Sequence, residues 1–351
     1  MHILGIMTGS KSPRPRFWDR YRSAAQQENF DDIIVFTPSS VNLSKQCIQG
    51  FVRNSSGWEK TECPLPSIVH DIGYYSNRAT IRKVKQIKAN PSIPFVGYAL
   101  GNKWRIHKQL LNTSIRPFLL PTKLAKTTDD IFQMVRRYRT VMIKPLNGKG
   151  GKGIIKFSEQ PDKSCFFQPS GEPGYSFKRS EAAARLEALL AKRRYLIQQW
   201  IDIRDEHERT NDVRILLQKN GLGKWIISAQ AIRHGKDGEI TSNLKSGGTA
   251  EPLEEGLAKR FNDEDQKAIL KQVERLSRRL PKVLERVYGK RFCELGVDLA
   301  IDRKQRVWLI EVNIKPGKSV LQLFGPEAMD AGFRAPIQYA RHLLEKNKIK
   351  T

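Results

Sequence analysis

A lysine and four glycines stand close together near the middle of the chain. An apolar run at 141–143 precedes Lys144, and the loop that follows contains Gly148, Gly150, Gly151 and Gly153. Backbone N–H groups approach a polyphosphate closely only where side chains are absent, and glycine tolerates the positive φ that such a loop requires. A lysine ammonium just before the loop can bind phosphate oxygens as a point charge. The segment therefore predicts a nucleotide phosphate site.

Two other interpretations of this loop stay open. An ordinary hairpin turn needs only one or two glycines, and the GxxG spacing at 148–151 and 150–153 matches the loop of KH nucleic-acid-binding domains. That spacing is short and common in glycine-rich stretches. A Walker A loop is excluded, because Val312 stands where its first glycine is required ahead of the Gly-Lys-Ser triplet at 317–319.

Oxygen-bearing side chains recur on two predicted strands near the C-terminus. The runs 296–302 and 307–313 are joined by a short polar turn and carry Asp298, Glu311 and Asn313. Side chains two apart on a strand share a face, so Glu311 and Asn313 point together and Asp298 can join them. Mg²⁺ is commonly bound by such carboxylates together with nucleotide phosphates. A solvated edge strand is the alternative, but 307–312 is apolar on both faces.

Two arginines interrupt apolar strands between these motifs. Arg214 lies within the run 213–217, and Arg233 follows a short apolar stretch in the same way. A charge rarely occupies such a strand without a partner or a ligand. Each arginine is therefore expected to meet a ligand, and for Arg214 a structural ion pair with Asp212 or Glu294 is the alternative.

Taken in order, these motifs resemble the ATP-grasp superfamily of carboxylate ligases over residues 102–317. The segment around Lys103 resembles the superfamily's first nucleotide-binding lysine motif, and Lys144 resembles the second. The segment 195–201 resembles the strand and hinge that bind adenine through backbone hydrogen bonds, which implies adenine-binding roles for Gln198, Gln199, Trp200 and Ile201. The segment 212–214 is similar to the arginine strand, and 311–317 to the magnesium signature.

A narrower resemblance is to the YheC/YheD branch, described as endospore coat-associated proteins. It rests on the segments 212–214, 223–225 and 231–233, and on Asn243 followed by two glycines at 247–248. Asn243 is expected to help hold phosphate or metal, although an asparagine before such a turn can also be only a turn residue.

The resemblance implies an ATP-dependent carboxylate–amine ligase that uses Mg²⁺. A carboxylate attacks the γ-phosphate to give an acylphosphate and ADP, and an amine then displaces phosphate. Lys103 and Lys144 would hold the α- and β-phosphates, the glycine loop would cover the β- and γ-phosphates, and Arg214 with Arg233 would neutralise charge on the transferred group. D-Alanine ligase-like relatives carry an arginine two residues before the first metal aspartate. This chain has Gly296 there, so Arg214 or Arg233 is expected to replace it.

Two other functions remain open. A small-molecule kinase on the same fold would leave a stable phosphorylated product and need no amine. A spore-coat-associated structural protein or a nucleic-acid-binding protein would retain the nucleotide pocket without turnover. The full set Asp298, Glu311 and Asn313 argues against the second, since a pocket freed from catalysis need not keep three metal ligands.

The elements that must position these residues fall into three regions. Residues 1–100 form a predicted Rossmann-like α/β domain, with strands at 3–7, 33–37, 67–71 and 95–98 and helices at 17–27 and 77–89, but without GxGxxG. Residues 101–200 form the lid region, with helices at 128–138 and 181–193. Residues 201–351 form the C-terminal lobe with the magnesium site and a helix capped by Asn262. The expected fold is α/β, a two-lobed α+β ATP-grasp fold behind a pre-ATP-grasp domain.

Charge and composition bound the partners and the compartment. The net charge is +26, from 62 basic and 36 acidic residues, and the excess is spread through helical segments such as 185–194 and 271–291. This predicts an anionic substrate or assembly surface, such as an acidic peptide, a polymer or a coat, with nucleic acid less favoured and a merely solvated basic surface as the alternative.

Four cysteines lack CxxC spacing, no apolar run is long enough to cross a bilayer, and the apolar start at 3–7 is too short for a signal-peptide core. The sequence thus predicts a cytoplasmic protein, with association to the spore coat in a spore-former.

Overall fold

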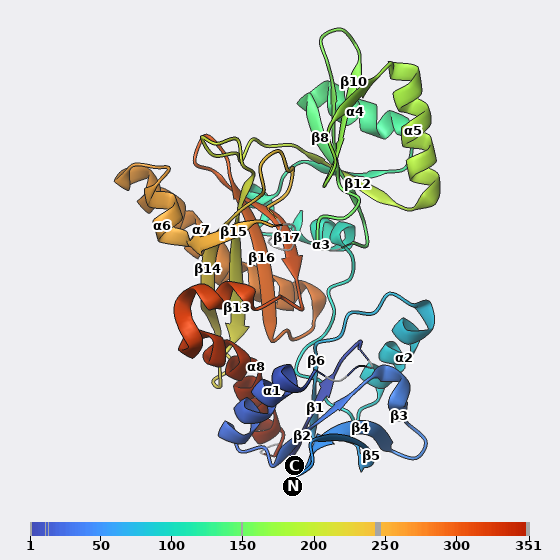
Figure 1. Cartoon of the computed structure of the whole chain (residues 1–351), viewed down its shortest axis with the longest axis vertical. Coiled ribbons are helices and arrows are strands. Elements are labelled where there is room, and N and C mark those ends of the chain that lie inside the picture. The colour runs from blue at the N-terminus through green and yellow to red at the C-terminus, as the bar shows by residue number, and fades with distance from the viewer. Residues whose placement is uncertain (1, 11, 13, 149, 243–246, 349–351) are drawn as a thin grey trace.

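Three β-sheets with their covering helices build the molecule. The structure is a computed structural model that describes residues 2–10, 12, 14–148, 150–242 and 247–348. Figure 1 shows the N-terminal domain at the bottom, the C-terminal lobe in the middle and a smaller lid at the top right. As expected, an N-terminal α/β domain precedes two further lobes that each have a sheet of their own.

The N-terminal sheet has a parallel centre. Strand β1 (Ile3–Met7) pairs in parallel with β2 (Asp32–Phe36) and with β6 (Ile68–Asp71). The sheet order is β3-β4-β2-β1-β6, and β3 (Val41–Asn42) follows the short 3-10 helix η1 (Pro38–Ser40). Helix α1 (Pro15–Gln27) and helix α2 (Arg78–Ala89) match the expected helices closely.

Two features of this domain differ from the sequence-based expectation. Residues 95–98 do not form a strand, and only Phe95 makes a single parallel bridge, with Val69. An antiparallel hairpin, β4 (Cys47–Arg53) and β5 (Trp58–Pro64), extends the sheet where no strand was expected. Strand β5 is mostly exposed, so it lacks the apolar alternation that identifies a half-buried strand in a sequence.

The lid is an antiparallel sheet with two helices on one face. Its order is β11-β10-β9-β8-β12-β7, formed by β7 (Thr122–Ala125), β8 (Thr140–Pro145), β9 (Ile155–Glu159), β10 (Cys165–Pro169), β11 (Tyr175–Phe177) and β12 (Tyr195–Gln199). Helices α4 (Thr128–Tyr138) and α5 (Arg179–Lys192) bury Val141, Ile143, Phe157 and Ile197 beneath them. Because side chains alternate along a strand, Lys144 and Gln198 lie on the opposite, uncovered face.

The C-terminal lobe is a five-stranded antiparallel sheet. Its order is β15-β14-β13-β16-β17, with β13 (Asn211–Lys219), β14 (Trp225–His234), β15 (Thr249–Pro252), β16 (Glu294–Ile301) and β17 (Val307–Asn313). Helices α6 (Leu253–Ala258) and α7 (Asp263–Tyr288) follow β15. As expected, Asn262 caps α7, and its side chain accepts from the Asp265 amide. The chain closes with the 3-10 helix η4 (Ser319–Phe324) and helix α8 (Gly325–Lys348).

Packing crosses the expected boundaries at two places. Helix α3 (Lys103–Leu110) and the 3-10 helix η2 (Arg116–Phe118) share a core with α7, β13 and β16, so this segment packs with the C-terminal lobe rather than with the lid sheet. Helix α8 packs on α1, which ties the end of the chain to the N-terminal domain.

Buried charges fasten the N-terminal domain to the C-terminal lobe. Asp71, at the end of β6, pairs with Lys315 at 2.6 Å and with Lys88 at 2.7 Å. His70, which precedes Asp71 on β6, lies 3.7 Å from Glu294 of β16. Glu294 also pairs with Lys318. Burial lowers the pKa of His70 to about 4, so its imidazole is neutral at ordinary pH. Breaking a buried pair such as Asp71–Lys315 is costly, so this contact stabilises the packing of the N-terminal domain on the C-terminal lobe.

Candidate functional site

The candidate metal ligands lie together on the C-terminal sheet. Strands β16 and β17 are antiparallel, Asp298 lies opposite Glu311, and Gly296 lies opposite Asn313. Residues two apart share a face, so the register brings Asp298, Glu311 and Asn313 to one face as the sequence predicted. Within the described residues no group of three or more His, Cys, Asp and Glu side chains is placed to hold a metal ion. The set therefore consists of two carboxylates and one amide, a hard oxygen set that fits Mg²⁺ when nucleotide phosphates complete the shell.

Basic side chains neutralise both carboxylates. Asp298 is only 7% exposed and is contacted by Arg214 Nε at 2.7 Å and by Arg233 Nη2 at 3.1 Å. Arg233 also donates through Nε to Asp212 at 2.6 Å, whereas Glu311 pairs with Lys103 at the start of α3. The ion pair that Arg214 makes is thus with Asp298, rather than with the Asp212 or Glu294 considered from the sequence.

Lys144 lies on the lid face that looks toward these carboxylates. Its ammonium donates to Gln198 Oε1 at 2.6 Å, and Gln198 donates in turn to Thr122 at 3.2 Å. Burial, assisted by the nearby Lys103 ammonium, lowers the pKa of Lys144 to about 8, while Glu311 and Asp298 oppose that shift. The charges of Lys103, Glu311 and Asp298 act on Lys144, so the lid lysine lies near the carboxylates of the C-terminal lobe, and we call the place where these groups meet the cleft.

A pH dependence follows from this position. Free Lys144 loses its proton as the pH rises through about 8, and a bound phosphate favours the protonated form. In metal-free buffer, ATP binding should therefore take up protons near pH 8, and the affinity should fall about tenfold between pH 7 and pH 9. Calorimetry in buffers of different ionisation enthalpy measures the uptake. A Lys144→Arg variant, which stays charged, should bind with little pH dependence; an unchanged dependence would contradict this origin.

The glycine loop joins β8 to β9 in the conformation that was expected. Gly150, Gly151 and Gly153 have φ between +66° and +74°, while Gly148 lies at the exposed start of the loop. A Cβ at Gly151 would lie 3.2 Å from Thr241 Oγ1, so the loop touches the C-terminal lobe. Arg193, which the sequence did not single out, reaches to 3.9 Å of the Cβ position of Gly153. Asn243 lies outside the described residues.

Two backbone N–H groups of the expected adenine hinge already donate to carbonyl oxygens of the protein. The Gln199 N–H donates to the Pro121 carbonyl at 2.9 Å, and the Trp200 N–H donates to the Thr140 carbonyl at 3.1 Å. Adenine contacts from these two residues would therefore use their carbonyl oxygens, and Ile201 follows directly. The Trp200 indole carries the Lys156 ammonium 4.5 Å above its ring. The adenine-binding roles of Gln198, Gln199, Trp200 and Ile201 stay predictions.

Arg214 occupies the space above Gly296, the position for which an arginine was expected from the resemblance. A Cβ at Gly296 would come within 2.8 Å of Arg214 Nη1 and within 2.8 Å of Pro316 Cβ. The guanidinium of Arg214, extending from β13, therefore covers the place from which a side chain at 296 would project. Arg233 is held between Asp212 and Asp298 with its side chain 11% exposed, so in this structure it braces Asp298.

Tyr74 is a cleft residue that sequence reasoning missed. It follows β6 in the N-terminal domain, and its hydroxyl donates to the Lys315 carbonyl just beyond β17. Burial raises the pKa of Tyr74, Arg214 opposes this rise, and Glu311 adds to it, which places the phenol near both groups. No local pattern marks such a tyrosine, because its partner lies 241 residues away in sequence.

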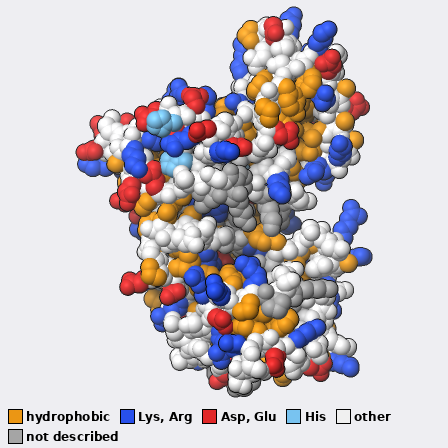
Figure 2. Space-filling model, viewed as in Figure 1, with side chains coloured by type: hydrophobic (Ala, Val, Ile, Leu, Met, Phe, Trp, Pro, Cys, Tyr) orange, Lys and Arg blue, Asp and Glu red, His pale blue; other side chains and the backbone are white. Residues whose placement is uncertain are grey.

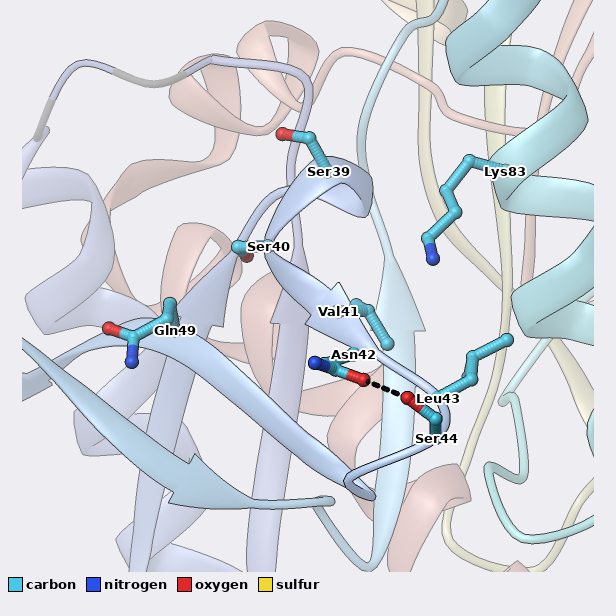
Figure 3. A pocket seen from close by; sticks show the side chains of 8 residues that line it. All are labelled: Ser39, Ser40, Val41, Asn42, Leu43, Ser44, Gln49 and Lys83. Carbon is cyan, nitrogen blue, oxygen red and sulfur yellow. Dashed lines mark hydrogen bonds between the residues drawn. The ribbon is translucent and has the colours of Figure 1, made fainter.

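Two hollows lie outside this cleft. One, of about 540 Å³, is in the N-terminal domain and is lined by Ser39, Ser40, Val41, Asn42, Leu43, Ser44, Gln49 and Lys83. Figure 3 shows the side chains that line it, with the Ser44 hydroxyl donating to Asn42 Oδ1 at 2.8 Å. The second, of about 650 Å³, lies on the uncovered lid face around Lys156, Ser158 and Phe166. Neither is lined by Lys103, Lys144, Asp298 or Glu311.

The visible surface carries its positive charge in a dispersed form. Figure 2 shows Lys and Arg side chains on the N-terminal domain, the C-terminal lobe and the lid, with acidic side chains among them. In the part of the chain that the structure describes, no helix combines the length and apolarity needed to cross a bilayer.

Comparison with known proteins places the chain in a family. The endospore coat-associated protein YheC of Bacillus subtilis (strain 168) is 24% identical over 329 residues, covering 90% of this chain and 89% of YheC. YheD of the same strain, also named endospore coat-associated, is 28% identical over 330 residues, covering 89% of this chain and 70% of YheD.

Solved structures agree on the fold. The D-alanine–D-alanine ligase of Bacillus anthracis superposes over 100% of both chains with a TM-score of 0.57 at 10% identity. The family model described as YheC/D-like ATP-grasp matches residues 92–343, which include the two lysines, the glycine loop and both acidic strands. The chain therefore belongs to the YheC/D-like ATP-grasp family.

Proposed function

We propose that this protein is an ATP-dependent ligase that joins a carboxylate to an amine through an acylphosphate. The observation that carries the proposal is that Lys144 of the lid lies within electrostatic reach of Asp298 and Glu311, which are paired across β16 and β17 of the C-terminal lobe. Family membership supports a nucleotide in that cleft, and a ligase named for joining two alanines has the same fold. The acidic peptide or polymer that the net charge suggests is the proposed substrate class.

Each side chain has a role that its position allows. Lys103 and Lys144 would hold phosphate oxygens from the two sides of the cleft, and the glycine loop would cover the terminal phosphates. Mg²⁺, held by Asp298, Glu311 and Asn313, would neutralise phosphate charge when bound. Arg214, beside Asp298 and near Tyr74, would orient the substrate carboxylate and stabilise charge on the transferred group.

The proposed reaction has two steps, and neither step needs a nucleophilic side chain of the protein. A substrate carboxylate oxygen attacks the γ-phosphorus, and the bond to the bridging oxygen breaks to release ADP. An amine nitrogen then attacks the acyl carbon, phosphate leaves with the bonding electron pair, and the nitrogen loses a proton. Closing the lid over the cleft excludes water, which would otherwise hydrolyse the acylphosphate.

Mass spectrometry tests this reaction directly. The protein is incubated with ATP, Mg²⁺, pooled amino acids and short acidic peptides, and the expected product has the mass of two substrates less one water, with ADP and phosphate formed in equal amounts. A stable product heavier by one phosphoryl group would show a kinase instead. Nucleotide binding without ADP release under every substrate combination would favour the structural alternative. The Glu311→Gln variant serves as the turnover-deficient control.

The cellular setting is proposed from the relatives. Because YheC and YheD are both named endospore coat-associated, we propose that this protein associates with the spore coat in a spore-forming host, while the cytoplasmic location stays a prediction from the sequence.

A further inference from the structure

One side of helix α7 carries a continuous row of positive charges. Its members are all exposed and recur every three to four residues, which puts them on one side of the helix: Lys267, Lys271, Arg275, Arg279, Lys282 and Arg286. We call this set the α7 cationic face. The buried side of α7, with Ile269, Val273, Leu276 and Leu280, packs into the core of the C-terminal lobe.

These charges form no ion pairs within the described part of the molecule. Among the residues that the structure describes, none of the six makes an ion pair or a side-chain hydrogen bond, whereas the neighbouring Arg278 pairs with Glu274 at 2.7 Å. Like charges at adjacent turns repel one another and destabilise a helix. An uncompensated row of this length therefore lowers the stability of α7 and indicates an external anion.

The row is long enough for a polymer. Lys267 and Arg286 are 286 − 267 = 19 residues apart, which corresponds to about 28 Å along the helix. Successive members lie roughly one helical turn apart, about 5–6 Å. Side chains on one side of an extended polypeptide recur at about 7 Å, so a run of Asp or Glu residues can pair with the row.

The α7 cationic face lies behind the sheet, and the C-terminal end of α7 lies next to α3, which begins at the cleft. Strand residues Val297 and Val213 pack beneath α7, whereas Asp298 and Arg214 point to the opposite face, so the α7 cationic face lies behind the sheet that carries the site. At the C-terminal end of α7, the Arg105 guanidinium lies 5.8 Å from the ring centroid of Tyr288. Arg105 belongs to α3, whose first residue is Lys103 at the cleft.

We propose that the α7 cationic face docks an acidic polypeptide and delivers it toward the cleft along α3. The exposed row contains no aromatic side chain, and proteins that bind single-stranded nucleic acids commonly stack bases on aromatic rings. An acidic polypeptide also supplies the carboxylates that an amide-forming ligase uses, and in this respect the inference rests on the proposed function. It names the partner and a docking surface remote from the chemistry.

Fluorescence anisotropy with a labelled poly-L-glutamate peptide tests the docking. A peptide of about nine or more residues spans the face at ~3.3 Å per residue. The triple variant Lys271→Gln/Arg275→Gln/Arg279→Gln should weaken its binding about tenfold or more at low salt. The matched control Lys45→Gln/Lys60→Gln/Lys85→Gln removes the same charge from exposed, unpaired positions of the N-terminal domain and should change binding less than about twofold.

Two outcomes would overturn the proposal. Equal weakening by both triple variants would mean that only the net charge attracts the peptide. Tighter binding of a single-stranded DNA of equal length than of poly-L-glutamate, lost in the α7 variant, would assign the face to nucleic acid. Binding is measured without ATP, so its failure leaves the proposed ligase untouched, and an absence of ADP release leaves the docking result intact.

Discussion

Replacing Asp298 with asparagine is expected to lower the free energy of unfolding by about 3–5 kcal/mol and to abolish ATP turnover. Asp298 is the carboxylate that Arg214 and Arg233 share, and all three side chains are at most 15% exposed. Removing one partner of a buried pair leaves an uncompensated charge, which is strongly destabilising. The low end of the range is expected, since Arg233 keeps Asp212. Urea unfolding and ADP release measure the two effects.

Glu311 provides the matched comparison. Its side chain is 27% exposed and its partner Lys103 can return to water, so Glu311→Gln should change the free energy of unfolding by less than about 1 kcal/mol. Turnover should nevertheless fall about a thousandfold, because the nucleotide end of the cleft loses a carboxylate. An Asp298→Asn protein as stable as wild type would contradict the buried triad, and an active Glu311→Gln protein would contradict the site.

Adding an arginine at position 296 should inactivate the protein unless Arg214 is removed at the same time. Even a Cβ at 296 would lie 2.8 Å from Arg214 Nη1, so Gly296→Arg alone forces two guanidinium groups into one space. Arg214→Ala alone should lower turnover about a thousandfold through loss of charge stabilisation. The double variant Gly296→Arg/Arg214→Ala should recover at least about tenfold of that loss, because the new arginine can enter the vacated space.

The double-mutant cycle makes this result specific. The pairwise coupling between positions 214 and 296 should be large, as expected for side chains that compete for one site. Gly296→Arg combined with an exposed change such as Lys224→Gln should show no recovery. Additive effects of the two substitutions at 214 and 296 would mean that Arg214 does not stand in for the arginine of related ligases.

Local periodicity explains which parts of the site could be predicted. Glu311 and Asn313 are two apart on an apolar strand, so their shared face is fixed by β geometry whatever the partner strand. The glycine loop is likewise local, and the positive φ of Gly150 and Gly151 is the conformation that glycine permits. Helix α7 was expected to begin at Asn262 for the same reason, since an asparagine cap and an apolar stripe are both readable from one segment.

Long-range contacts explain what could not be predicted. Arg233 and Asp212 are cross-strand neighbours on β14 and β13, and only the register of that pair shows that Arg233 is committed to two carboxylates. Tyr74 reaches the cleft through a contact that spans most of the chain. The backbone N–H groups of Gln199 and Trp200 donate to Pro121 and Thr140, which are distant in sequence. The hinge motif itself does not predict these two partners.

The ion pair between Asp71 and Lys315 joins the N-terminal domain to the C-terminal lobe and leaves the lid outside this junction. If the Asp71–Lys315 contact holds, the N-terminal domain, the acidic strands and α7 would move as one block relative to the lid sheet. Under the proposed function, spent nucleotide would leave past the lid while an acidic polypeptide stays bound to the α7 cationic face. This arrangement would permit a processive mode, in which successive additions are made to one chain without its release.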